Sequence, residues 1–222
     1  KENDYHKQLV DSAGNMIQSS MSTLNHLILN YDNAPILTPL DDYSCLEEKD
    51  KFINNVLYYN KENQLEQYLG DFLVEEYKNK DPKKRQNWNT DASRLTYINR
   101  ELVNNKPSWI IDKKGVKMTE IIIDPFLDYV KELCQNIIKE SQIEIEEQES
   151  NNIKIKIFKK MEGLSDVIKN INNKILSKEI NIYLAPHLYF DKNNCIAVKK
   201  TKQNQLINKK NDIINICSDD ST

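Results

Sequence analysis

The chain contains little glycine, proline or cysteine, and these shortages exclude several classes of protein. Four glycines and six prolines in 222 residues are too few for an all-β protein, which needs many tight turns. The glycines stand alone in the sequence, so the glycine-rich loops with which many enzymes hold phosphate groups are absent. Hydrophobic residues make up 39% and charged residues 29%, which is typical of a soluble and largely helical protein.

The cysteines and histidines are too widely spaced to form a recognisable metal site. No two cysteines have the C-x-x-C spacing of a zinc knuckle or a redox pair. We therefore expect free thiols, no bound metal and no cofactor. The residues concerned are Cys45, Cys134, Cys195, Cys217, His6, His26 and His187.

Long apolar runs are also absent. No segment approaches the roughly 18 apolar residues of a membrane-spanning helix, and Lys1 begins a polar stretch where a signal peptide would be apolar. A first residue other than Met indicates that something upstream has been removed. The sequence thus predicts a cytosolic or nuclear protein without a membrane partner.

Charge is unevenly distributed along the chain. Residues 1–77 carry 5 Lys or Arg and 14 Asp or Glu, residues 78–118 carry 11 and 4, and residues 119–222 carry 15 and 16. The net charges of these segments are therefore −9, +7 and −1. A basic segment inside an acidic chain can approach a polyanion while the remainder keeps the protein soluble. The alternative is a solvated loop in a lysine-rich chain.

The sequence predicts four parts. Residues 1–45 form a helix and an extended linker that contains two prolines. Residues 46–141 form the main domain, residues 142–200 a helical segment with a small hairpin, and residues 201–222 a disordered tail. The first helix has a seam that favours a homo-oligomer or docking on the rest of the chain. This seam consists of Ala13, Ile17, Ser20, Leu24, Leu27 and Tyr31.

The main domain begins with two short helices, at residues 46–59 and 63–78, whose apolar residues recur at intervals of three and four. Asp81 and Pro82 end the second helix, because this pair disfavours continued helix. The basic loop that follows contains Lys83, Lys84 and Arg85.

A third helix is predicted to begin at Thr90 or Asp91, whose side chains can accept a hydrogen bond from a first-turn N–H. At 100° per residue, Leu95, Ile98 and Leu102 share one side of it. The opposite side presents Ser93, Thr96, Tyr97, Arg100 and Asn104. Such side chains can bond base edges or phosphate oxygens, as a recognition helix does. Plain solvent exposure would produce the same polar face.

A β-hairpin is predicted next, with apolar β-prone runs at 109–112 and 116–123 on either side of a turn at Gly115. Glycine can adopt the positive φ that such a turn requires. Lys113, Lys114 and Lys117 would lie at the tip, like the wing of a winged helix along a phosphate backbone. Lysines that keep an exposed strand soluble are the alternative.

Asp124 and Pro125 form an N-cap and first-turn pair that predicts the start of another helix. The helical segment beyond it alternates acidic and basic runs, EIEEQE and KIKIFKK. We expect this segment to fold back on the core, with a small hairpin turning at residues 192–194.

Enzyme signatures are sparse. Asp112, Lys113 and Lys114 have the carboxylate-x-lysine form that some metal-dependent nucleases place on a strand, where the carboxylate holds Mg²⁺. Asp91 or Glu101 would have to supply a second acid. Nucleophile-elbow and kinase signatures are absent, so we expect no catalytic residues and keep a metal-dependent nuclease as the third hypothesis.

Four segments of the chain resemble sequences of an uncharacterised protein family of giant amoeba viruses of the mimivirus kind. These segments are residues 68–80, 87–94, 109–117 and 123–130. The resemblance extends to residues 24–43 and 183–198, and so covers most of the chain. Members of that family often carry zinc fingers ahead of a helical spacer, and this chain contains no such finger. The resemblance implies a viral protein of unassigned activity, located in the host cytoplasm (viral factory) or in the virion.

These patterns predict a mainly α protein (α+β minor) with a winged-helix-like core, one β-hairpin, flanking N- and C-terminal helices and a small C-terminal hairpin. The leading hypothesis is a non-enzymatic module that binds double-stranded DNA. Its predicted contact residues are Lys83, Lys84, Arg85, Ser93, Tyr97, Arg100, Asn104, Lys113, Lys114 and Lys117. The alternative is a protein–protein scaffold or oligomerisation module, in which Trp88 and Trp109 anchor an interface unless they belong to the core.

Overall fold

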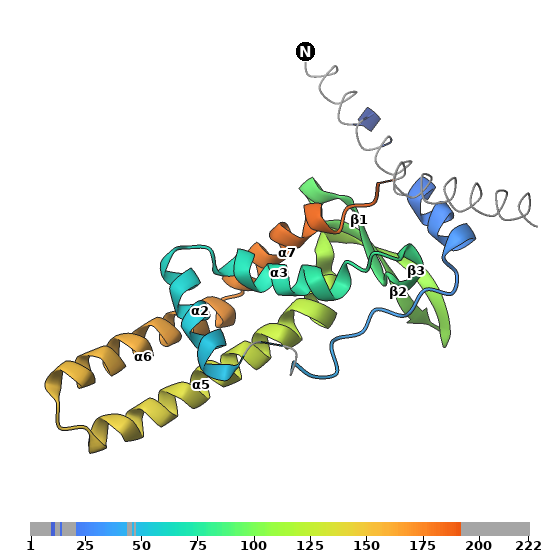
Figure 1. Cartoon of the computed structure of the whole chain (residues 1–222). Coiled ribbons are helices and arrows are strands. Elements are labelled where there is room, and N and C mark those ends of the chain that lie inside the picture. The colour runs from blue at the N-terminus through green and yellow to red at the C-terminus, as the bar shows by residue number, and fades with distance from the viewer. Residues whose placement is uncertain (1–9, 12–13, 15–20, 44–45, 47, 192–222) are drawn as a thin grey trace, which may run out of the picture. The chain divides into compact units, whose positions relative to one another are not determined.

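A computed structural model describes residues 10–11, 14, 21–43, 46 and 48–191. Helices predominate, and the strands form one three-stranded antiparallel sheet in the order β1-β2-β3 (Figure 1). The mainly α class is therefore confirmed. The chain divides into a unit of residues 1–189 and a second unit of residues 190–222, and the elements below belong to the first. The hairpin predicted at 192–194 and the tail at 201–222 lie outside the described residues.

Residues 21–30 are helical, and the end of the predicted N-terminal seam packs inward, because Leu27 and Tyr31 are buried. Seam positions 13, 17 and 20 lie outside the described residues. The indole Nε1 of Trp109 donates to the carbonyl oxygen of Tyr31 at 3.2 Å, and the Tyr31 ring stacks on Trp88 at 6.4 Å between centroids. Both tryptophans are buried and belong to the core.

The two short helices of the main domain are confirmed as α2 (Lys49–Lys61) and α3 (Leu65–Tyr77). Each buries one apolar stripe, and the stripe of α3 recurs at intervals of four, with Leu65, Leu69 and Leu73 all buried. The side chain of Asp81 accepts a hydrogen bond from the backbone of Lys83 at 3.1 Å. It thereby starts a 3-10 turn, Pro82–Lys84, after α3 has already ended at Tyr77, so the Asp81–Pro82 pair does not end that helix as predicted.

The sheet is a meander of β1 (Asn87–Asp91), β2 (Thr96–Val103) and β3 (Lys106–Asp112). β2 and β3 are joined through Asn104 and Asn105, which both have positive φ, 50° and 61°. Two consecutive residues with positive φ make a type I′ turn, whose twist matches that of the paired strands. The hairpin of this protein therefore turns at Asn104 and Asn105.

The predicted recognition helix at residues 90–104 is wrong. The capping signal is present, since Oδ1 of Asp91 accepts a hydrogen bond from the backbone of Arg94 at 3.2 Å. The helix ends after one 3-10 turn, Ala92–Arg94, because Leu95 adopts a left-handed conformation with φ 51°. The residues that follow pair with both neighbouring strands, where β-branched and aromatic side chains such as Tyr97 pack well.

The hairpin predicted around Gly115 is wrong in its second half. β3 confirms the first strand, but a short helix α4 (Val116–Met118) and a π-helical turn (Thr119–Ile123) run directly into α5 (Asp124–Glu147). Gly115 has the expected positive φ, 63°, yet it starts a helix. The winged-helix arrangement of a recognition helix and a wing at Gly115 is therefore not formed.

Residues 116–123 are helical because of what the helix buries. Met118, Ile122 and Ile123 are all at most 1% exposed, whereas a strand would have placed neighbours such as Ile122 and Ile123 on opposite faces of the sheet. Helical spacing thus brings more apolar surface to the core than the predicted strand.

Asp124 does not cap a helix, because the chain is already helical before it. Its carboxylate instead accepts hydrogen bonds from Nζ of Lys174 and Oγ of Ser177, both at 2.9 Å. The π-helical turn lies just ahead of Pro125, whose ring nitrogen has no hydrogen to donate.

α5 and α6 (Asn151–Asn172) form an antiparallel pair that projects from the rest of the unit (Figure 1). We call the part of this pair beyond residue 136 on α5 and before residue 166 on α6 the arm. α7 (Ile175–His187) returns and packs against α3. The core combines residues from Leu37 to Leu188, so segments on both sides of residues 46–141 contribute to it. Among the described residues, no helix is long and apolar enough to cross a membrane.

Candidate nucleic-acid interface

Three of the ten predicted contact residues are buried, which corrects their predicted role. Arg85, Tyr97 and Arg100 are 6%, 0% and 4% exposed. Each of them holds separate parts of the chain together. None can reach a phosphate or a base edge from the position that it occupies.

Arg85 joins the end of α7 to the start of the sheet. Its guanidinium carbon lies 3.6 Å from the centroid of the Trp88 ring, a cation–π contact. Its Nη2 donates to the carbonyl oxygen of Leu188 at 3.2 Å, and the same oxygen accepts from the backbone of Asn89 at 2.9 Å. The charge of Arg85 is therefore used inside the protein.

Arg100 fastens the N-terminal linker across the sheet. Its Nη2 donates to the backbone carbonyl of Asp32 and lies 3.3 Å from Oδ1 of the same residue. Its guanidinium carbon lies 5.6 Å from the centroid of the Trp109 ring. The backbone of Leu37 donates to the carbonyl oxygen of Arg100 at 2.6 Å, so the linker is bonded to β2 as well.

Tyr97 takes part in a buried latch with Asn181 of α7. The Tyr97 hydroxyl lies 3.1 Å from the carbonyl oxygen of Asn181 and 2.9 Å from its Oδ1. Nδ2 of Asn181 donates to the carbonyl oxygen of Gly115 at 3.2 Å and to Oγ1 of Thr119 at 3.1 Å. Burial raises the pKa of Tyr97 above its ordinary value, so the hydroxyl keeps its proton. The latch joins β2, α7 and the start of the helix after β3.

The other seven predicted residues are exposed and are divided between the two ends of the sheet. β1 begins opposite Asn99, and β2 continues from there to its turn, so the loop before β1 and the β2–β3 turn share one end. That end contains Lys83, Lys84 and Asn104, and the other end is followed by Ser93, Lys113, Lys114 and Lys117. At about 3.3 Å per residue, the ends of β3 are roughly 20 Å apart. The predicted single surface is therefore two surfaces.

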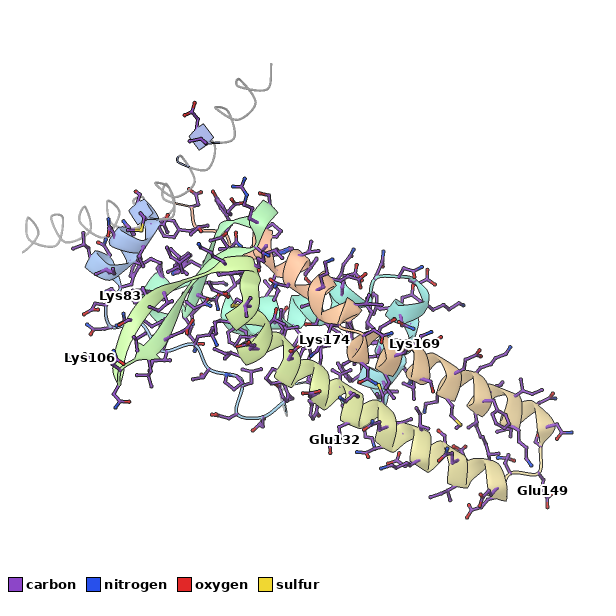
Figure 2. The ribbon with its side chains drawn as sticks, turned by 180° about the vertical axis from the view of Figure 1, so that it is seen from behind. Lys83, Lys106, Glu132, Glu149, Lys169 and Lys174 are labelled. Atoms are coloured by element: carbon purple, nitrogen blue, oxygen red, sulfur yellow. The ribbon has the colours of Figure 1, made fainter. Side chains whose placement is uncertain are left out.

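In the sequence, five exposed lysines flank the end with the turn: four lie between α3 and β1, and one is the first residue of β3. Lys83 and Lys106 lie at this same end of the sheet in Figure 2. Within the part of the chain that the structure describes, no carboxylate lies within ion-pair distance of any of the five. We call them the hairpin-end lysines: Lys78, Lys80, Lys83, Lys84 and Lys106.

Lys106 was missed by the sequence analysis, because the turn that places it was assigned to a helix. The signal that could have found it is the Asn-Asn pair at 104 and 105 between two β-prone runs, since asparagine tolerates positive φ. Lys117, by contrast, was predicted but is paired with Glu120 at 2.8 Å. Its charge is partly neutralised within the protein.

Asp112, the candidate nuclease carboxylate, has a structural role. Its Oδ2 accepts a hydrogen bond from Nδ2 of Asn99 at 3.2 Å and from the backbone of Met118 at 3.0 Å. Burial raises the pKa of the neighbouring Glu101 carboxyl, Lys117 lowers it, and the charge of Asp112 raises it further. Among the described residues, no three metal-ligating side chains converge. The two acids therefore do not form a metal site with a third ligand there.

A cavity of about 390 Å³ lies between the α2–α3 turn and the α6–α7 turn. Its lining includes Glu66, Glu179 and Tyr183. The Tyr183 hydroxyl donates to Oδ1 of Asp71 at 2.5 Å, and this hydrogen bond, with burial, raises the pKa of Tyr183 to about 12.

Comparison of the chain with protein-family models, with curated proteins and with solved structures found no match. The geometry of the exposed residues is therefore the basis on which a function can be inferred.

Proposed function

We propose that this chain is a non-enzymatic module of a viral protein that binds double-stranded DNA through the hairpin-end lysines. The observation that carries the proposal is that Lys83 and Lys106, from two separate segments, lie at the same end of the sheet (Figure 2). Together these segments hold five exposed lysines that have no ion pair among the described residues. The resemblance to a giant-virus family suggests DNA in the host cytoplasm (viral factory) or in the virion as the partner.

The local charge balance supports this proposal. Of the eleven basic residues in 78–118, Arg85 and Arg100 are buried, and Arg94 and Lys117 are paired with Asp91 and Glu120. Seven exposed lysines remain, and five of them are the hairpin-end lysines. Each lysine that neutralises a phosphate releases a counterion, which favours binding at low salt.

The contacts expected from this arrangement are contacts with the DNA backbone. β2 replaces the predicted recognition helix, and its base-reading candidates Tyr97 and Arg100 are buried. Lysines in turns bind phosphates as point charges and carry no sequence information. We therefore propose binding without strong sequence preference, with Asn104 in the turn as the one predicted polar contact that remains at this end.

Fluorescence anisotropy of a labelled duplex, titrated at several salt concentrations, tests the proposal. The variant Lys83→Ala/Lys84→Ala/Lys106→Ala should reduce the slope of log affinity against log salt by about 0.9 per lost contact. The control Lys61→Ala/Lys169→Ala/Lys178→Ala removes the same charge from exposed positions on α2, α6 and α7 and should leave the slope nearly unchanged. Wild-type protein without affinity at low salt, or equal losses in both variants, would contradict the proposal.

A second candidate is a protein–protein scaffold, favoured by the apolar side chains that the arm exposes. Ile143 is 61% exposed on α5, and Ile155 and Phe158 are 52% and 55% exposed on α6. Large apolar side chains gathered on a projecting element are typical of an interaction surface. Sedimentation velocity tests this candidate, because a chain that stays monomeric at every concentration would contradict self-assembly.

A further inference from the structure

One side of the arm is covered by α2 and the opposite side is open. Nζ of Lys49 on α2 lies 2.9 Å from Oε1 of Glu140 on α5. A Cβ added to Gly163 on α6 would lie 2.8 Å from Cδ2 of Leu57 on α2. Glu140 and Gly163 therefore mark the side of each helix that faces α2. Figure 2 shows α5 and α6 from the other side.

The open side carries apolar side chains from both helices. At 100° per residue, Phe158 lies about 140° around α6 from Gly163, and Ile145 lies about 140° around α5 from Glu140. Phe158 is largely exposed, and its apolar neighbours on this side are partly buried. We call this set the open face: Ile138 and Ile145 from α5, with Phe158 and Met161 from α6.

Charge on the arm is separated by helix. Residues 140–149, at the end of α5, contain five Glu and no Lys or Arg, while residues 150–160, at the start of α6, contain four Lys and no Asp or Glu. Among the described residues, no ion pair joins these two segments. The arm therefore presents an acidic helix and a basic helix side by side, and the ion pair of Glu140 runs to Lys49 of α2 and not across the arm.

We propose that the open face pairs with the open face of a second copy of this chain, with the two arms parallel and their tips together. Two helical hairpins joined through their apolar faces form a four-helix bundle, and identical copies pair most often about a two-fold axis. An axis along the arm places α6 of each copy on α5 of the other. An axis across the arm would place acidic α5 on acidic α5, so the charges select the first arrangement.

The heights of the side chains fit this arrangement. Lys154 lies three residues after the start of α6, and Glu146 lies one residue before the end of α5. At 1.5 Å per residue both are within about 5 Å of the tip, so Lys154 of one copy faces Glu146 of the other. By the same measure, Phe158 lies at a height between those of Ile138 and Ile145 of the second copy. The pairing thus covers the exposed aromatic ring and matches the charges at once.

Sedimentation velocity over a range of concentrations tests the apolar part of the proposal. The wild-type chain should show a monomer–dimer equilibrium, and Phe158→Ser should weaken it at least about tenfold because two buried rings are lost per dimer. The matched control is Ile143→Ser, which removes a similarly exposed side chain about 140° around α5 from Ile138. It should change the dissociation constant less than about twofold. A wild-type chain that remains monomeric, or equal effects of the two substitutions, would overturn the proposal.

A charge exchange tests the arrangement itself. Glu146→Lys makes the tip of the arm more basic and Lys154→Glu makes it more acidic, so each variant should dimerise more weakly with itself. An equimolar mixture should recover dimers, because both contacts between the two variants are then between opposite charges. No recovery on mixing, or growth into open chains, would overturn the two-fold arrangement. The hairpin-end lysines take no part in this contact, so loss of DNA binding and loss of dimerisation are separate outcomes.

Discussion

Replacing Tyr97 by phenylalanine removes one buried hydroxyl and leaves the aromatic ring in place. The hydroxyl lies 3.1 Å from the carbonyl oxygen and 2.9 Å from Oδ1 of Asn181, and Tyr97 is 0% exposed. We expect the free energy of unfolding to fall by about 1–3 kcal/mol, because a buried acceptor on Asn181 loses its donor. For a unit of this size, each kcal/mol lowers the melting temperature by about 2–4 °C.

Urea denaturation followed by tryptophan fluorescence measures this loss, since Trp88 and Trp109 both lie in the sheet. The control is Tyr58→Phe, which removes the same hydroxyl from an exposed position on α2 and should change stability by less than about 0.5 kcal/mol. DNA affinity at full folding should be unchanged in both variants. A loss at Tyr97 no larger than the loss at Tyr58 would refute the reasoning, because the latch would then contribute nothing measurable.

Two further substitutions test the structure near β3. Gly115→Ala should cost at least about 2 kcal/mol of unfolding free energy, because Gly115 has φ 63° and its added Cβ would lie 2.4 Å from Nδ2 of Asn181. The control is Gly14→Ala, where an added Cβ has nothing within 4 Å. Equal effects of the two substitutions in thermal unfolding would contradict the strained conformation and close contact of Gly115. Burial, with a contribution from the charge of Asp112, raises the pKa of Glu101. The contribution of the protonated Glu101 carboxyl to the free energy of unfolding is therefore complete below the pKa of the unfolded chain and is lost as pH rises through the pKa of the folded chain. Glu101→Gln should therefore increase stability more at pH 7 than at pH 4 in urea titrations, and a gain independent of pH would count against this explanation.

Local sequence determined the two short helices α2 and α3. The apolar spacing of Leu65, Leu69 and Leu73 predicted α3, and Asp81 caps the turn that follows, because both effects act within a few residues. The helix itself ends earlier than the Asp81–Pro82 pair, at Tyr77. The positive φ at Gly115 was also foreseen. The mainly α class and the basic segment follow from composition alone, which needs no tertiary contact.

The tertiary structure decided which secondary structure formed between residues 90 and 104. Asp91 caps a turn, and the apolar spacing beyond it suits a helix as well as a strand. Residues 96–103 form a strand because they pair with β1 and β3. The sequence pattern of residues 90–104 alone carries no information about these partner strands. Leu95, with its left-handed conformation, is the point at which the two outcomes separate.

The tertiary structure also decided which of the predicted basic residues are exposed and which are buried. Arg100 is buried because Asp32, 68 residues away, accepts its hydrogen bonds, and Arg85 is held by the carbonyl oxygen of Leu188, 103 residues away. An arginine is equally basic on the surface and in such a contact, so its charge is visible in the sequence and its accessibility is not. Charge is a property of a residue, whereas exposure is a property of the residues that the fold brings around it.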